Sequence, residues 1–247
     1  MIAHQRHEQI LESVRKNGTV TVPELARSLG TSESTIRRDL AELDSAGLLT
    51  KVHGGATSLE DQHVQRDLTI DERAGLHDDA KMRIALEAAK LICPNDLVYI
   101  DSGTSTRALI DVLTQTNALY VTDSVANGMA LKKRGFRVIL LGGELKGATG
   151  ALVGPEALDT LSHYYFAIGF WGTNGITYEQ GFTTPDRYEA QVKRVSMEHT
   201  TRPYVLADQS KFGRCAAISF ASMEAATILT DQVPESYKDF KNIHTVS

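Results

Sequence analysis

One segment, Thr31–Leu40 (TSESTIRRDL), constrains the fold of this 247-residue chain more than any other feature. It follows a short amphipathic segment, Val20–Leu29, and a single turn glycine, Gly30. Two short helices joined by a glycine-containing turn form a helix-turn-helix, a motif whose second helix enters the major groove of DNA. The order of these segments therefore predicts a helix-turn-helix.

Both predicted helices carry start signals. Thr21 and Glu24 have the S/T-x-x-E spacing of a capping box, and Ser32 is the expected N-cap of the second helix. Apolar residues then recur at i, i+4 and i+7, so one stripe of the second helix is expected to face the core. These residues are Ile36, Leu40 and Leu43.

The other face of the second helix carries side chains suited to contacting DNA. Arginine is the commonest bidentate partner of guanine, and Arg37 and Arg38 lie near the predicted helix N-terminus. Leu49–Val52, followed by two glycines, predicts a β-hairpin that forms a wing along the DNA backbone. The candidate DNA-binding residues are Ser32, Ser34, Thr35, Arg37, Arg38, Lys51 and His53. The alternative is a small helical bundle with exposed arginines, but the turn, caps, stripe and wing occur together in the order of a winged helix-turn-helix.

Residues 6–57 resemble the N-terminal domain of the DeoR family of bacterial transcriptional regulators. The hallmark of that family is a TIRRDL recognition helix followed by a histidine-glycine-glycine wing, which appear here as Thr35–Leu40 and His53–Ala56. Thr31 stands where the family usually has valine before the cap serine. The resemblance implies binding to a double-stranded DNA operator.

Composition is that of a globular chain. With 42% hydrophobic residues, the chain has enough apolar side chains for a sizeable core and for two domains. It has no apolar run of about 18 or more residues and no signal-peptide core, so a cytoplasmic location without membrane contact is expected. Cys93 and Cys215 have no second cysteine or histidine at metal-ligand spacing. Buried, reduced thiols and no bound metal are therefore expected.

Charge is distributed unevenly along the chain. Residues 1–57 hold seven Lys+Arg and seven Asp+Glu, and residues 81–247 hold 17 of each, whereas residues 58–80 hold two against seven and supply the whole net charge of −5. We predict a DNA-binding domain over 1–57, an acidic linker over 58–80, and an effector-binding and oligomerisation domain over 81–247. Since affinity for DNA depends largely on phosphate neutralisation, one copy is expected to bind weakly, which favours a homo-oligomer, a dimer or tetramer.

Helical and strand patterns alternate after residue 81. Strand-like runs, with helical patterns between several of them, occur at Leu97–Ile100, Leu119–Thr122, Phe136–Leu141, Tyr164–Gly169, Pro203–Ala207 and Thr227–Thr230. Such alternation predicts a parallel sheet with helices on both faces, that is, a Rossmann-like α/β domain.

A polar loop, Asp101–Ser105 (DSGTS), follows the first of these strands. Ligands of open α/β sheets bind at the carboxyl ends of the strands. In this loop Gly103 lets the backbone approach a ligand, its serine and threonine neighbours supply hydroxyl groups, and the next helix supplies free N–H groups. These features suit a phosphate monoester, and the alternative is an ordinary βα turn capped by Ser or Thr. The chain has neither a G-x-G-x-x-G nor a G-x-x-x-x-G-K-[ST] motif, so no nucleotide cofactor is expected.

The second domain also resembles the DeoR family. The matching motifs are Asp101–Thr104 (DSGT), Thr122–Ser124, Gly142–Gly143 and Asp208–Phe212 (DQSKF), so the resemblance spans residues 6–230. It implies a domain similar to the sugar-phosphate isomerase and CoA-transferase fold, which senses a phosphorylated sugar.

The resemblance also implies residue roles. The phosphate is expected to be held by Ser102, Gly103, Thr104 and Ser105, with Lys211 as the counter-charge. The sugar hydroxyls are expected to be held by Asp101, Glu189 and Lys193. The remaining candidate ligand-binding residues are Thr122 and Asp123. Glu189 and Lys193 stand at i, i+4, so a surface ion pair is the alternative for them.

Two positions depart from the family pattern. Asp123 stands where Asn is common, and a carboxylate near a phosphate would repel it, so Asp123 either points away from the ligand or meets ligand hydroxyls. Trp171 follows the fourth strand where smaller residues are common, and we expect it in the core rather than in the pocket.

The sequence thus predicts a DNA-binding transcriptional regulator without catalytic activity, a repressor of a carbohydrate-utilisation operon that a phosphorylated sugar relieves. Two alternatives stay open. One is an isomerase- or transferase-like enzyme with an accessory DNA-binding domain, in which Asp101, Glu189 and Lys193 supply acid–base chemistry, although a shared fold does not confer activity. The other is a constitutive DNA-binding protein whose second domain serves only for oligomerisation.

Overall fold

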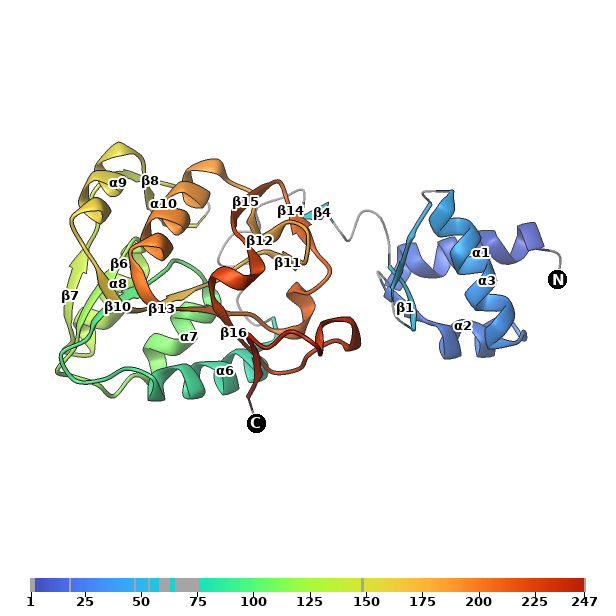
Figure 1. Ribbon diagram of the computed structural model, residues 1–247, viewed down its shortest axis with the longest axis horizontal. Coiled ribbons are helices and arrows are strands. Elements are labelled where there is room, and N and C mark those ends of the chain that lie inside the picture. Colours follow the sequence, from blue (N-terminus) through green and yellow to red (C-terminus); the bar gives the residue numbers. More distant parts are fainter. Residues whose placement is uncertain are drawn as a thin grey trace. The chain divides into compact units, whose positions relative to one another are not determined.

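The computed structural model describes residues 3–17, 19–46, 48–52, 54–57, 63–64, 76–147 and 149–246. The chain divides into two compact units, Met1–His63 and Val64–Ser247, whose elements are labelled in Figure 1. Within the described ranges, no helix combines the length and the apolar character needed to cross a membrane.

The first unit packs three helices against a small antiparallel sheet. The helices are α1 (Ala3–Asn17), α2 (Val22–Ser28) and α3 (Glu33–Ser45), and the strands β1 (Thr19–Thr21), β2 (Thr50–Val52) and β3 (Gly55–Thr57) lie in the order β1-β3-β2. Its core contains the predicted stripe of α3 and apolar side chains of α1, α2 and the sheet: Ile10, Val14, Val20, Leu25, Ile36, Leu40, Leu43 and Leu49. This is the predicted winged helix-turn-helix.

The predicted start signals of both helices are confirmed. The Thr21 hydroxyl accepts a hydrogen bond from the Glu24 N–H, and the Glu24 carboxylate accepts one from the Thr21 N–H, which completes the capping box of α2. Ser32 caps α3 by accepting from the Thr35 N–H at 3.3 Å. Gly30, in the turn between them, has φ of 60°, a left-handed conformation that favours glycine.

The predicted wing is also present. β2 and β3 pair as an antiparallel hairpin, with Lys51 opposite Ala56. β1 pairs with the other edge of β3, so residues 20 and 21 extend the sheet and do not begin the helix. A Cβ at Gly55 would lie 2.1 Å from the Val20 carbonyl oxygen, so this close approach of strands requires glycine. His53 lies outside the described residues.

The second unit is built on a seven-stranded sheet with the order β17-β16-β13-β10-β5-β6-β7, in which all neighbouring strands are parallel. The strands are β5 (Leu97–Ile100), β6 (Leu119–Thr122), β7 (Arg137–Leu140), β10 (Phe166–Trp171), β13 (Thr200–Leu206), β16 (Thr227–Thr230) and β17 (Ile243–Thr245). The chain runs outward from β5 to β7 and then returns to the other side of β5 with β10. The strand order therefore reverses beside β5, and such a switch point is where ligands bind in α/β sheets.

Helices cover both faces of this sheet, as predicted. They are α6 (Asp78–Lys90), α7 (Thr104–Val112), α8 (Val125–Lys133), α9 (Pro155–Ser162) and α10 (Arg187–Glu198). One buried apolar cluster includes side chains of α6, α7 and α8, and a second includes side chains of α9 and α10. Figure 1 shows α6 and α7 on one side of the sheet and α9 and α10 on the other.

Shorter elements complete the second unit. β11 (Gly175–Thr177), β12 (Gly181–Thr184) and β15 (Ile218–Ala221) form a three-stranded sheet, and β8 (Glu144–Leu145) pairs with β9 (Leu152–Val153). The remaining elements of this unit are β14 (Cys215–Ala216) and the 3-10 turns η1 (Gln209–Lys211), η2 (Met223–Ala225) and η3 (Glu235–Tyr237), and the short strand β4 (His63–Val64) spans the boundary between the two units. Trp171 is fully buried in the core, as expected, and its ring stacks on Tyr99 at 5.4 Å.

Two expectations differ from the structure. The thiols are free, but Cys93 is exposed and Cys215 is partly exposed, so the prediction of buried thiols is wrong. Cys93 lies in the turn after α6, where its N–H donates to Asp96. The predicted linker over 58–80 extends too far, because α6 begins at Asp78. Acidic residues in a first turn are favoured by the helix dipole, so the acidic side chains of residues 78 and 79 mark a helix start.

Candidate functional site

The N-terminal end of α3 presents polar and basic side chains to solvent. Ser34, Arg37 and Arg38 are exposed and Thr35 is partly exposed. The Ser32 hydroxyl lies 2.9 Å from the hydroxyls of both Ser34 and Thr35, so these three side chains form a hydrogen-bonded cluster around the helix start. A helix N-terminus of this kind, with hydroxyls and arginines, can contact phosphates and base edges.

The hairpin places a further cation beside this helix. A groove of about 360 Å³ lies between α3 and the wing, and both Arg37 and Lys51 line it. Arg37 also donates to Glu33 at 2.9 Å, an exposed i, i+4 pair that holds the guanidinium along the helix. The structure therefore places Ser32, Ser34 and Thr35 together at the start of α3 and brings Arg37 and Lys51 to one groove, while Arg38 is exposed on the same helix.

Sequence reasoning missed one charged cluster of this unit. Arg6 and His7, both on α1, bond to Asp39 on α3, and Asp39 is buried. Arg6 lowers the pKa of the Asp39 carboxyl from its ordinary value of 3.8, with a smaller contribution from His7. A sequence signal for this cluster exists: Asp39, the acidic residue of the RRDL motif, has the helical spacing that places it on the buried side of α3 with Ile36 and Leu40.

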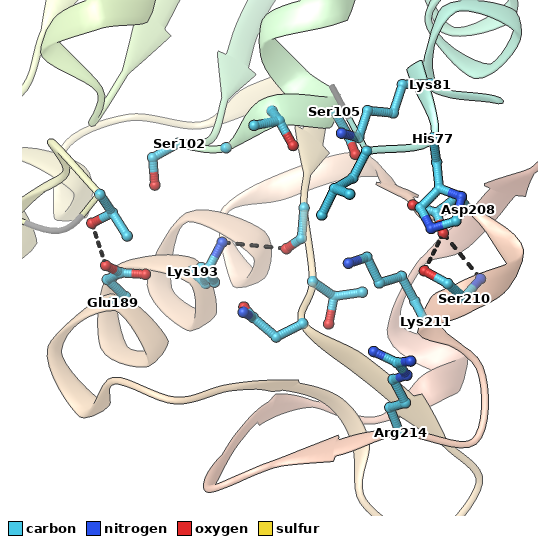
Figure 2. A pocket seen from close by; sticks show the side chains of 17 residues that line it. His77, Lys81, Ser102, Ser105, Glu189, Lys193, Asp208, Ser210, Lys211 and Arg214 are labelled. Atoms are coloured by element: carbon cyan, nitrogen blue, oxygen red, sulfur yellow. Dashed lines mark hydrogen bonds between the residues drawn. The ribbon is translucent and has the colours of Figure 1, made fainter. Parts of the chain in front are cut away.

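The second unit has a cavity of about 150 Å³ at the carboxyl end of β5. Its lining comes from α6, the loop before α7, the residues after β10, α10 and the η1 region (Figure 2). The lining residues are Leu76, His77, Lys81, Ser102, Gly103, Thr104, Ser105, Thr149, Gly172, Thr173, Asn174, Glu189, Lys193, Asp208, Ser210, Lys211 and Arg214. Seven of the ten predicted ligand-binding residues are among them.

The loop of residues 102–105 differs from an ordinary capped turn. The N-cap of α7 is Gly103, with φ of 141°, and among the described residues no side chain accepts a hydrogen bond from the start of this helix. By contrast, Ser32, Ser124 and Asp186 cap α3, α8 and α10 with their own side chains. The first-turn N–H groups of α7 thus lack a side-chain acceptor at the edge of the cavity, which is the arrangement of an anion-binding helix N-terminus.

Basic side chains surround this loop. Lys211 lines the cavity, together with three residues that sequence reasoning missed: His77, Lys81 and Arg214. Figure 2 shows Lys81 beside Ser105, with Lys211 and Arg214 reaching in from the opposite side. No local motif marks these residues, because they come from segments that only the folded sheet brings together.

Glu189 and Lys193 are not a surface pair, because their exposed fractions are 5% and 4%. Glu189 accepts a hydrogen bond from the Thr149 hydroxyl at 2.5 Å. Lys193 donates to the Asp101 carboxylate and to the Gly172 carbonyl, the latter at 3.3 Å. Both side chains line the cavity, so α10 presents one carboxylate and one ammonium group to it.

The three other predicted residues lie outside the lining. Asp101 is fully buried, and its Oδ2 accepts from Lys193 and from the Gly172 N–H at 3.0 Å. Thr122 uses its hydroxyl to accept from the Ser124 N–H at 3.1 Å. Asp123 is also buried, and its Oδ1 has no hydrogen-bond partner among the described residues. Burial raises the pKa of the Asp123 carboxyl well above 3.8, the nearby Asp101 charge raises it further, and Lys193 opposes the shift.

Comparison with known proteins gives matches for both units. Residues 6–62 match the model described as the DeoR-like helix-turn-helix domain, and residues 76–232 match the DeoR C terminal sensor domain. The chain is 40% identical to the uncharacterised HTH-type transcriptional regulator FruR of Bacillus subtilis (strain 168), over 95% of this chain and 93% of that protein. It is 34% identical to the glycerol-3-phosphate regulon repressor of Escherichia coli (strain K12), over 93% and 91% of the two chains.

Two further matches are more distant in sequence. The lactose phosphotransferase system repressor of Staphylococcus epidermidis (strain ATCC 12228 / FDA PCI 1200) is 32% identical, over 94% of this chain and 93% of that protein. Among solved structures, ribose 5-phosphate isomerase A from Methanocaldococcus jannaschii matches 55% of this chain and 54% of its own, with a TM-score of 0.40 and 16% identity.

Proposed function

Since this chain belongs to the DeoR family of transcriptional regulators, we propose that it represses a carbohydrate operon and that a phosphorylated sugar bound in the cavity of the second unit relieves repression. The protein is a DNA-binding regulator with a winged helix-turn-helix and a sensor domain. Relatives with names of repressors include those of a glycerol-3-phosphate regulon and a lactose phosphotransferase system.

For DNA, the proposal assigns base contacts to Arg37 and Arg38 and backbone contacts to Lys51. The two arginines are exposed at the start of α3, and the groove that Arg37 shares with Lys51 supports a common DNA-facing surface. The hydroxyl cluster of Ser32, Ser34 and Thr35 adds phosphate donors at the same helix end. His53 remains a candidate from sequence alone.

For the effector, the observation that carries the proposal is the α7 N-terminus without a side-chain cap, at the edge of a cavity with basic lining. A phosphate monoester would accept from the first-turn N–H groups and from the hydroxyls of Ser102, Thr104 and Ser105. Lys81, Lys211 and Arg214 would supply positive charge. Glu189 and Lys193, on the α10 side, would contact the sugar hydroxyls.

The buried residues beneath the cavity have a different proposed role. Asp101 holds Lys193 in place and so orients a ligand-contacting ammonium group. Burial raises the pKa of the Asp123 carboxyl, which favours its neutral form and so weakens the repulsion of a phosphate bound nearby. This accounts for an Asp at a position where the family commonly has Asn.

Control of DNA binding requires two arrangements of the protein. An effector shifts the population between them only by its differential affinity. The family context and the zero net charge of residues 1–57 favour a homo-oligomer, a dimer or tetramer, because a second copy doubles the cations that reach DNA. The relatives are regulators, which disfavours the isomerase-like alternative.

Thermal melting of the purified protein against matched free and phosphorylated sugars tests the effector assignment. Saturation at 100 times Kd adds about 2.7 kcal/mol, which corresponds to a rise of about 5–10 °C in Tm for a chain of this size. A rise with one phosphorylated sugar and none with its free partner would support the phosphate site. A Tm indifferent to every phosphorylated sugar would remove it and favour the constitutive DNA-binding alternative.

A further inference from the structure

The recognition helix α3 contains a buried carboxylate. Asp39 directly follows the arginine pair, yet only 3% of it is exposed. Its two oxygens accept from Arg6 of α1: Oδ2 from Nε at 2.5 Å and Oδ1 from Nη2 at 2.9 Å. This is the bidentate geometry of an arginine–carboxylate pair, which fixes orientation as well as distance.

The next residue of α1 adds to this contact. His7 Nε2 lies 3.2 Å from Asp39 Oδ1 and 3.6 Å from Glu42 Oε2. Glu42 is one helical turn beyond Asp39, so adjacent residues of α1 bridge two turns of α3. The side chains of Arg6 and His7 are largely buried, whereas that of Glu42 is mostly exposed.

The position of Asp39 relates this contact to the DNA-facing side chains. Residues two apart on an α-helix differ by about 200° around its axis, so Asp39 and Arg37 point in nearly opposite directions. The apolar stripe of α3 packs without strong directionality. A bidentate pair on the inner face instead specifies one rotation of the helix, and that rotation sets where Arg37 and Arg38 point.

Stability alone is a weak reason for such a pair. Desolvation of two buried charges offsets much of their attraction, so apolar residues of similar size often stabilise as well or better. What the ion pair adds is one preferred geometry.

We propose that Arg6, assisted by His7, is a positioning residue that orients recognition helix α3 through Asp39 and thereby sets the discrimination between operator and other DNA. The proposal rests on the DNA-binding role of α3. It assigns no contact between Arg6 and DNA.

The test measures the ratio of affinities of the full chain for two duplexes. One is the duplex that the wild-type chain selects from a random pool, and the other is a scrambled duplex of equal length. The variants are Arg6→Gln, Asp39→Asn, their double variant and Arg6→Lys, with Glu12→Gln as the control because Glu12 is exposed on the same helix.

Asp39→Asn separates positioning from electrostatics. Removing a negative charge from a DNA-binding helix should tighten binding to any DNA, whereas loss of orientation should weaken operator binding selectively. We expect the ratio to fall about tenfold in Arg6→Gln and in Asp39→Asn, the scale of one lost base contact. The double variant should fall no further, because both changes remove one interaction.

Circular dichroism at the assay temperature identifies the folded variants. Arg6→Lys retains the charge but not the bidentate geometry, so it should fold and show a smaller fall in the ratio. If the other variants do not fold, the affinity ratio of Arg6→Lys alone tests the proposal. The proposal would be overturned if the ratio of operator affinity to scrambled-duplex affinity equalled that of the wild type in Arg6→Lys and in every other variant that folds. Absence of discrimination in the wild-type chain itself would instead contradict the DNA-binding assignment of α3.

Discussion

Lys193 on α10 donates to the carboxylate of Asp101 at the end of β5, 92 residues earlier in the chain. Both side chains are buried. The contact joins the helix that follows β12 to the strand at the switch point of the sheet, directly beneath the cavity. The same Lys193 side chain also lines the cavity.

Lys193→Met should destabilise the second unit. It leaves the Asp101 carboxylate buried without its cation, and breaking such a pair costs about 3–5 kcal/mol. Thermal melting should show a fall in Tm of about 2–4 °C for each kcal/mol. Adding Asp101→Asn should recover part of the loss, since the unpaired charge is removed. A double variant no more stable than Lys193→Met would contradict this account of the pair.

Asp123→Asn should stabilise the protein by an amount that grows with pH. The pKa of Asp123 is raised in the folded state, so above pH 3.8 the unfolded chain releases a proton that the folded chain retains. Stability of the wild type therefore falls as pH rises toward the raised pKa, and asparagine removes this dependence. Denaturant unfolding at pH 5 and pH 8 measures it, with exposed Asp159→Asn as control. An equal effect at both pH values would argue that Asp123 is ionised when folded.

Thr104→Val should weaken the effector response and leave operator affinity intact. Valine keeps the shape of threonine but removes a hydroxyl at the start of α7, and a hydrogen bond to a charged group is worth about 1.5–3 kcal/mol. Effector affinity should therefore fall about tenfold or more in a melting titration. Thr160→Val on α9 is the matched control, since its hydroxyl bonds within that helix. A response equal to that of the control would remove the phosphate-loop assignment.

Arg38→Ala and Lys51→Ala should weaken DNA binding in different ways. If Arg38 contacts a base, its removal lowers discrimination between sequences by about 1–3 kcal/mol. Lys51→Ala should weaken binding to all DNA sequences equally, and the slope of log affinity against log salt concentration should fall in magnitude by about one. Fluorescence anisotropy over a salt series separates the two. The assignment of roles fails if Lys51→Ala alters discrimination while Arg38→Ala does not.

Local signals explain why much of the fold could be predicted. The capping box at Thr21 and Glu24 and the cap at Ser32 involve residues three apart, so the sequence displays them directly. The strands Leu97–Ile100 and Leu119–Thr122 are short apolar runs between polar turns, and their predicted bounds agree with the structure. Elements with weaker patterns were missed, among them α9 and the β11-β12-β15 sheet.

The candidate site could be predicted only in part. The residues of the loop Ser102–Ser105 are contiguous and of types that bind phosphate, so the sequence pattern predicts this part of the site. Lys81 and Arg214 come from separate segments and reach the same cavity only after the sheet has formed. The burial of Glu189 and Lys193 could not be predicted either, because their i, i+4 spacing is the same on a surface helix as on a helix that lines a cavity.

Operator binding titrated with one phosphorylated sugar and its free counterpart tests the central claim most directly. The wild-type chain should lose operator affinity as the phosphorylated sugar saturates and should not respond to the free sugar. The Thr104→Val variant should bind operator normally and should need about tenfold more phosphorylated sugar for the same loss. Operator affinity that no phosphorylated sugar changes, in a chain that discriminates its operator, would contradict the account.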